Sequence, residues 1–338
     1  MLVAFANRDG KGCAKGDVLM VNRDNWKLVK RYLAYQRDVL QRDPQTVDRC
    51  WCSLRHLLEW ANSARIANVR SIRPVFPAWL AERGFVHDGV ARSCNIARAF
   101  FTWLKEEYPG RYTRITDVWL DTLRPAREPE KPAHRDVYTL EDMRKIVALP
   151  ASTLADQRDI AAVALLFLSG MRVGAFTSLT VGCVDLRRRA VRQWPELGVK
   201  TKGGKRAETY LLNVADLLRV VRRWDKVVRA RLLESALWYA PLGPAGVELQ
   251  AGQPRSSYRR EKVSAALRRL CELSGVQYRS PHKLRHGHAV YALGLARDVA
   301  DLKAISQNLM HSDLRTTDQI YAILGNEDVM TRIGGLTK

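Results

Sequence analysis

A proline-bearing segment divides this chain into two parts. Within residues 122–138, Pro125, Pro129 and Pro132 stand among charged residues. Proline lacks a backbone N–H and disfavours helix at the residue before it, so this segment is predicted to be an extended linker. The 338 residues supply enough chain for two domains with cores of their own. The predicted division is a flexible arm at 1–18, a helical domain at 19–121, the linker at 122–138, and a second domain at 139–338 that ends in a C-terminal tail.

Apolar residues recur at helical spacing on both sides of the linker. Before it, stripes that begin near Asn25 predict four helices, the last ending near residues 108–110. After it, Thr139 is predicted to cap a helix, with Asp142 reciprocating. Short strands are expected at 191–194, 199–201 and 208–212, turned at Gly203 and Gly204, and helices at 213–234, 257–274, 280–293, 298–308 and 312–323. The predicted fold is mainly α with a small β-sheet, a helical domain followed by a mixed α/β domain.

The chain is strongly basic. It holds 56 Lys and Arg against 35 Asp and Glu, a formal net charge of +21. A polyanionic partner is therefore expected, either nucleic acid or a membrane surface. Residues 1–135 hold 24 basic against 15 acidic residues and the remainder 32 against 20, so both parts are expected to touch the polyanion. No apolar run approaches the ~20 residues of a membrane span, and the chain is expected to remain inside the cell.

The six cysteines are scattered and form no C-x-x-C pair. Cys50 and Cys52 flank Trp51, but no second Cys or His pair lies nearby at zinc spacing. Reduced and mostly buried thiols are the better interpretation. No metal or cofactor site is predicted.

Residues suited to phosphate chemistry recur along the second part. A tyrosine hydroxyl is a poor nucleophile at neutral pH because its pKa lies near 10. Guanidinium forks assist its attack, since they neutralise the phosphate charge that repels it. An ammonium group can protonate a departing oxygen. The set comprises two arginines, a lysine, two histidines and a tyrosine, namely Arg172, Lys202, His282, Arg285, His311 and Tyr321. It suits attack by a phenol on a DNA phosphodiester without a metal.

Local patterns place some of these side chains. His282 and Arg285 lie three apart and share a face if helical. Ser280 as N-cap and Pro281 as first helical residue predict a helix start there, and a helix N-terminus favours anions. Taken alone, each residue has an ordinary alternative. An arginine of a basic protein is usually a surface group, a lone histidine is usually structural, and Tyr321 alone would be a packing aromatic.

A basic run surrounds Lys202. The ammonium group of Lys202 could act as a general acid, whereas the whole run could simply bind DNA backbone. The residues expected to contact DNA outside the chemical step are Lys200, Lys205, Arg206 and Lys283.

The order and spacing of these motifs resemble the tyrosine recombinase (phage integrase) family. The resemblance covers about residues 139–325 and, more loosely, residues 20–125. It rests on the H-x-x-R of His282 and Arg285, on His311 followed by Ser312, and on Tyr321 ten residues later. The family implies a helical, SAM-like core-binding domain at 19–121 and a mixed α/β catalytic domain at 139–338.

The family roles carry over residue by residue. The resemblance implies that Tyr321 forms a 3′-phosphotyrosyl link. The register to the family's lysine implies that Lys202 is the general acid, with Lys200 as the second choice. The resemblance implies further that His282 supports proton transfer and phosphate binding, and that the remaining phosphate contacts come from Arg172, Arg285 and His311. Neither ATP nor metal is implied, because the covalent link conserves the bond energy. The family also implies duplex DNA clamped by both domains, and four protomers on two paired sites.

Two positions depart from the family pattern. Ala175 stands where the family has Glu or Asp, three residues after its first arginine, and Met310 stands where it has glycine before its second histidine. The acid normally buttresses the site, so Arg172 or Lys202 is expected to be held differently here. Neither departure removes a reacting group.

The sequence therefore predicts a site-specific DNA recombinase, integrase- or transposase-like, at the nucleoid in the cytoplasm. Two rivals remain open. One is a non-catalytic DNA-binding protein on the same scaffold, supported by Ala175. The other is a type IB topoisomerase-like enzyme, which the small helical domain disfavours. Integration of a mobile element, dimer resolution and inversion are not distinguished by the sequence.

Overall fold

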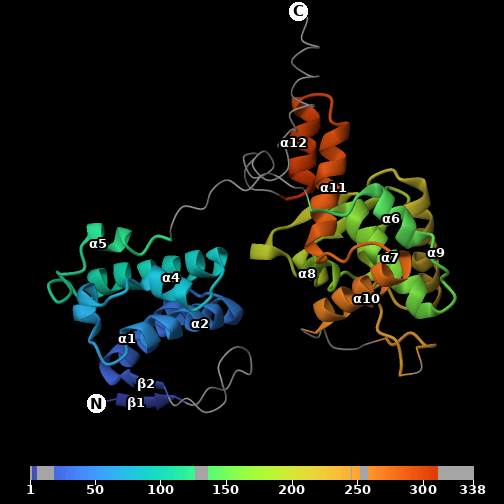
Figure 1. Cartoon of the computed structure of the whole chain (residues 1–338). Coiled ribbons are helices and arrows are strands. Elements are labelled where there is room, and N and C mark those ends of the chain that lie inside the picture. The colour runs from blue at the N-terminus through green and yellow to red at the C-terminus, as the bar shows by residue number, and fades with distance from the viewer. Residues whose placement is uncertain (1, 6–18, 126–135, 245, 252–257, 311–338) are drawn as a thin grey trace, which may run out of the picture. The chain divides into compact units, whose positions relative to one another are not determined.

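The chain folds as two compact units, Met1–Pro132 and Ala133–Lys338. The structure is a computed structural model, and it describes residues 2–5, 19–125, 136–244, 246–251 and 258–310 (Figure 1). No helix of the described residues is both long enough and apolar enough to cross a membrane.

The first unit is helical, with one hairpin. The expected four-helix region is present, and a further short helix follows it, with the buried Trp119 and Leu120 in that helix and Thr116 as its cap. The elements are β1 Leu2–Phe5, β2 Leu19–Asn22, α1 Arg23–Ala34, the π-helix η1 Tyr35–Val39, α2 Pro44–Ala61, the 3₁₀ helix η2 Ile66–Ser71, α3 Phe76–Glu82, α4 His87–Glu107 and α5 Asp117–Asp121.

The first-unit core lies between α1, α2 and α4, which contact one another. Tyr32 of α1 packs edge-on against Phe100 of α4, with ring centroids 5.4 Å apart, and 5.2 Å from Trp103. Phe100 is fully buried, and burying such a side chain stabilises a fold by about 1.5–3 kcal/mol. The apolar stripes predicted from the sequence thus account for this core.

The arm predicted at 1–18 is in part a strand. Leu2–Phe5 pairs antiparallel with Leu19–Asn22, with Val3 opposite Val21. The first residues are apolar and include Val3 and Phe5, which favour extended backbone, so they find a partner once the chain turns back. The prediction missed this hairpin because the two strands are short and far apart in sequence.

The second unit contains the small sheet. The capping box predicted for Thr139 and Asp142 is confirmed, since each side chain accepts the other's backbone N–H. The elements are α6 Leu140–Val147, α7 Leu154–Ser169, α8 Val173–Phe176, η3 Val181–Cys183, β3 Val184–Asp185, β4 Ala190–Gln193, η4 Pro195–Leu197, η5 Lys202–Gly204, β5 Ala207–Tyr210, α9 Ala215–Arg231, α10 Arg259–Ser274, α11 His282–Leu295 and α12 Val299–Asn308. The helix predicted at 312–323 lies outside the described residues.

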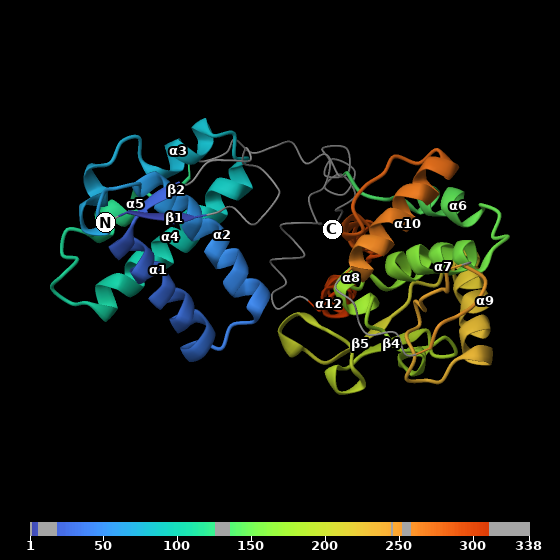
Figure 2. The same ribbon diagram turned by 90° about the horizontal axis from the view of Figure 1, so that it is seen from below.

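Helix α7 is the centre of the second unit. Every residue from Asp159 to Ser169 is buried, and α6, α9, α10 and α11 all contact α7. Figure 2 shows α6, α9 and α10 beside α7. A helix that is apolar on all faces must be enclosed by others. Because α7 is enclosed, the chain that leaves its C-terminal end starts from a fixed point.

The sheet has three antiparallel strands in the order β3, β4, β5, with Val191 of β4 opposite Thr209 of β5. The strand predicted at 199–201 is wrong. Pro195 begins a 3₁₀ turn there, and Gly198 ends that turn with a φ of +82°. The connection from β4 to β5 is therefore a long loop, and the third strand is the two-residue β3. The predicted class, mainly α with a small sheet, is confirmed.

Candidate active site

The end of α7 sets the place of Arg172. The helix stops at Gly170, whose φ of +61° is left-handed and whose N–H bonds the Leu166 carbonyl. A Cβ at Gly170 would lie 2.6 Å from His288 Cδ2, so only glycine fits. Two residues later, partly buried Arg172 leads into α8. The sequence prediction that Arg172 follows a buried helix is confirmed.

Helix α11 begins at His282, one residue later than predicted. Pro281 is its N-cap residue, and no side chain caps the helix. The prediction of Ser280 as a side-chain cap is wrong because Ser280 supplies its backbone carbonyl instead, which accepts the N–H of Lys283 over 2.8 Å. His282 and Arg285 still lie one turn apart on α11, as the spacing predicted.

Arg285 is almost completely buried, with 3% of its surface exposed. Its guanidinium donates to the Gly170 carbonyl over 2.7 Å and also to the Leu309 carbonyl. Charge-assisted hydrogen bonds of this kind are roughly twice as strong as neutral ones. One side chain therefore joins the turn before Arg172 to the residue two positions before His311.

The surroundings of His282 are cationic. Its pKa is lowered from the ordinary value of 6.5, first by partial loss of hydration and then by Arg285, Arg172 and Lys283. These charges act on the imidazole, so both arginines of the predicted set lie in its neighbourhood. A depressed pKa keeps the ring neutral near pH 7, where it can accept a proton. The ring of His286 packs edge-on to it, with centroids 4.6 Å apart.

Sequence reasoning missed His288, which lies 2% exposed beside the Gly170 turn. Its Nδ1 lies 2.8 Å from the Phe167 carbonyl, which can only accept, so Nδ1 carries the proton. Burial is the main cause that lowers the pKa of His288 to about 4. His288 is thus a neutral support for the turn. The H-x-x-R-H-x-H run was the available signal, but nothing in it separates a supporting histidine from a reacting one.

The basic run lies in the β4–β5 loop. Lys202 opens η5, and Gly203 and Gly204 follow with φ values of +70° and +65°. Lys200 and Lys205 are exposed, as expected of groups that contact DNA backbone. Arg206 is engaged within the loop itself, stacked 4.0 Å over the Trp194 ring and paired with Glu196 at 3.2 Å.

His311 and Tyr321 lie outside the described residues. The described chain ends at Met310, which has a φ of +54° and donates its N–H to the Gln307 carbonyl over 2.8 Å. Met310 follows the C-cap of α12, a position where glycine is preferred because a Cβ is disfavoured there. The left-handed backbone therefore explains why the family pattern has glycine at this position, where this chain has Met310.

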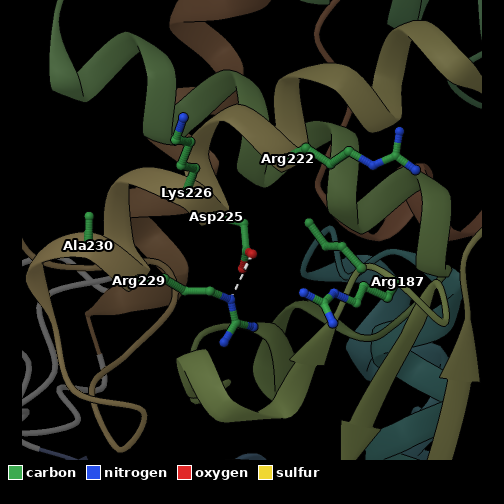
Figure 3. Close-up of a pocket in the computed structure, with 7 residues that line it drawn as sticks. Arg187, Arg222, Asp225, Lys226, Arg229 and Ala230 are labelled. Atoms are coloured by element: carbon green, nitrogen blue, oxygen red, sulfur yellow. Dashed lines mark hydrogen bonds and ion pairs between the residues drawn. The ribbon is translucent and has the colours of Figure 1, made fainter.

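A separate hollow of about 640 Å³ lies on α9 and the turn after β3 (Figure 3). Asp225 binds Arg229 over 2.8 Å, whereas Arg187, Arg222 and Lys226 are exposed and carry no ion pair within the described part of the chain. Of the six predicted catalytic residues, the four that the structure describes do not line this hollow. It offers positive charge for a polyanion.

Comparison with known proteins identifies the family of this chain. The model of the phage integrase family matches residues 137–327. The tyrosine recombinase XerD of Rhizobium meliloti is 29% identical over 245 residues, which cover 72% of each chain. The tyrosine recombinase XerC of Xanthomonas campestris is 24% identical over 302 residues, which cover 88% of this chain and 84% of that protein.

Solved structures share the fold. The Tn1549 transposon integrase in complex with circular intermediate DNA has a TM-score of 0.60 at 13% identity, and the match covers 93% of this chain and 99% of that one. A lambda integrase dimer bound to a COC′ core site has a TM-score of 0.61 at 15% identity, with 87% and 94% covered. The matched family model spans more than half of the sequence, so the chain belongs to the phage integrase family of tyrosine recombinases.

Proposed function

We propose that this protein is a site-specific DNA recombinase that cuts and rejoins duplex DNA through a 3′-phosphotyrosine intermediate. Family membership and one structural observation support the proposal. Arg285 binds the carbonyls of Gly170 and Leu309, and so gathers three segments that are far apart in sequence. Those segments carry Arg172, the His282–Arg285 pair and the approach to His311.

The proposed chemistry assigns a task to each group. The phenol oxygen of Tyr321 bonds to phosphorus, and the bond from phosphorus to the 5′ oxygen breaks. The phenol proton passes to His282, whose lowered pKa leaves it neutral and able to accept. Lys202 gives a proton to the departing 5′ oxygen. The phenol oxygen thus loses one proton, and the 5′ oxygen gains one. Rejoining runs the same steps in reverse.

Charge stabilisation falls to the cations. Arg172, Arg285 and His311 contact the non-bridging oxygens, where negative charge develops in the transition state. Donors fixed before the reaction act most strongly at such positions, and Arg285 is fixed by burial and by two carbonyls. Arg285 is therefore proposed as the organising cation of the site.

DNA is the proposed partner of both units. The formal charge of +21 and the exposed cations of the β4–β5 loop and of α9 support contact with phosphates. The helical unit is the proposed core-binding domain at 19–121, and residues 122–138 the linker to the catalytic domain at 139–338. We further propose a tetramer on two paired sites, acting on DNA at the nucleoid.

A DNA substrate nicked beside the cleavage site tests the proposal. Loss of the short fragment traps the covalent adduct, which a non-catalytic binder would never form. Transfer of the trapped strand to a second site distinguishes a recombinase from an enzyme that only relaxes DNA. Strict dependence of the adduct on magnesium would contradict the proposed mechanism.

A further inference from the structure

Ser178 connects two segments of the candidate active site. The residue lies just after α8 and is 3% exposed. Its hydroxyl donates to the Ala175 carbonyl over 2.9 Å and accepts the backbone N–H of Lys200 over 2.8 Å. A hydroxyl can donate once and still accept, so both bonds form together. The Gly174 carbonyl lies further from the same hydroxyl, at 3.5 Å.

The two connected segments are those of Arg172 and Lys202. The Arg172 carbonyl accepts the N–H of Ala175 over 2.9 Å, so Ser178 bonds the same helical turn that Arg172 begins. On the other side, Lys200 is two residues before Lys202. The hydroxyl therefore links the helical turn that Arg172 begins to the lysine loop, through a bond between residues 22 apart in sequence.

Beyond Lys200, the contacts of Arg206 with Trp194 and Glu196 lie within the loop itself. Gly203 and Gly204 both have left-handed φ values, which glycine adopts without steric cost. The hydroxyl of Thr201 is buried but bonds nothing among the described residues. The Ser178 bond is thus the anchor nearest in sequence to Lys202 that a side chain of the helical core supplies.

The Ser178 anchor lies one helical turn from Ala175, the position where the family resemblance implies Glu or Asp. Position 175 holds a buried alanine, whose methyl group cannot accept a hydrogen bond. Ser178 is one turn further along, and it uses the backbone carbonyl of Ala175 while it holds the loop. A hydroxyl accepts one N–H without placing a negative charge in this buried position, where an unpaired carboxylate would be costly.

We infer that Ser178 is a positioning residue for the general acid Lys202. The inference rests on the proposed function. A general acid contributes about 10²–10⁴-fold only when it lies within hydrogen-bond reach of the leaving oxygen. Release of the Lys200 N–H lets the loop move, so Lys202 reaches the oxygen less often.

Two nicked duplexes that carry the mapped cleavage site test this role, one with a normal 5′-bridging oxygen and one with sulfur there. Sulfur leaves without a proton. Ser178→Ala should slow cleavage of the oxygen substrate roughly tenfold and of the sulfur substrate less than about twofold. Thr177→Val is the matched control, because the buried Thr177 hydroxyl donates to Gly174 over 3.2 Å and does not bond the loop. It should alter the rates on the two substrates equally.

A second variant covers loss of folding. Ser178→Thr keeps the hydroxyl and should cleave both substrates at nearly the wild-type rate even where Ser178→Ala unfolds. An equal loss on both substrates for Ser178→Ala, or no loss on either, would overturn the positioning role. Failure of the wild-type protein to form any covalent adduct would instead overturn the proposed function, so the two failures are distinguishable.

Discussion

The two sides of the candidate active site are held in opposite ways. On one side, Arg172 follows a glycine turn that His288 and Arg285 enclose, and Arg285 is almost completely buried. On the other side, Lys202 belongs to an exposed loop with two left-handed glycines and an anchor at Lys200. Groups that stabilise charge work best when fixed beforehand, whereas a proton donor on a loop can close over bound DNA. The site therefore combines a rigid half, which holds Arg172 and Arg285, with an adaptable half, the loop of Lys202.

Among changes to the two halves, replacement of the buried arginine should reduce the cleavage rate most, because it disrupts the rigid half of the site. Arg285→Lys keeps the positive charge, but an ammonium group cannot form the planar fork that reaches the Gly170 and Leu309 carbonyls. Cleavage should fall by about 10²–10³-fold, as when a preorganised donor is lost. DNA affinity, measured by fluorescence anisotropy, should change little. Cleavage within threefold of wild type would show that Arg285 does not organise the site.

The adaptable half should fail in a different manner. Lys202→Ala should slow cleavage of a normal substrate by about 10²-fold or more, with binding retained. A 5′-bridging phosphorothiolate should restore the rate because sulfur needs no proton, whereas it should not restore Arg285→Lys. If Lys200→Ala is rescued and Lys202→Ala is not, the acid is Lys200.

Acid should loosen the rigid half through His288. Its folded pKa of about 4 lies below the ordinary 6.5, so the unfolded chain takes up the proton first as pH falls. The contribution to stability is present above pH 6.5 and is lost as pH falls from 6.5 toward 4, by about 1.4 kcal/mol for each pH unit. Urea denaturation of wild type and His288→Leu across this window measures it. The two slopes with pH should differ, and parallel curves would refute the assignment.

The smallest effect concerns the turn before His311. Met310→Gly should relieve the left-handed backbone and stabilise the protein by about 0.5 kcal/mol, after the entropy cost of glycine. Met310→Asn should fall between the two, because asparagine tolerates this region better than methionine. Thermal unfolding provides the comparison. Destabilisation by both variants would mean that contacts of the Met310 side chain outweigh backbone strain.

The sequence predicted what depends on pattern and spacing. Apolar periodicity placed most helices, and the Thr139–Asp142 capping box was readable because its partners are local. The spacing of His282 and Arg285 put both on one turn of α11. Local pattern could not predict bonds between distant segments, such as those from Ser178 to Lys200 and from Arg285 to Leu309. It also misplaced a strand at 199–201, because β-branched Val199 is buried in a loop.

Tyr321 is the proposed nucleophile, and formation of the covalent protein–DNA adduct measures this role. Tyr321→Phe removes a single hydroxyl from a large basic surface, so DNA affinity and its dependence on salt should be unchanged. On a nicked duplex, wild type should accumulate a protein–DNA adduct linked through a 3′-phosphotyrosine, and Tyr321→Phe should form none. An undiminished phosphotyrosyl adduct in Tyr321→Phe would contradict the assignment of Tyr321 as the nucleophile.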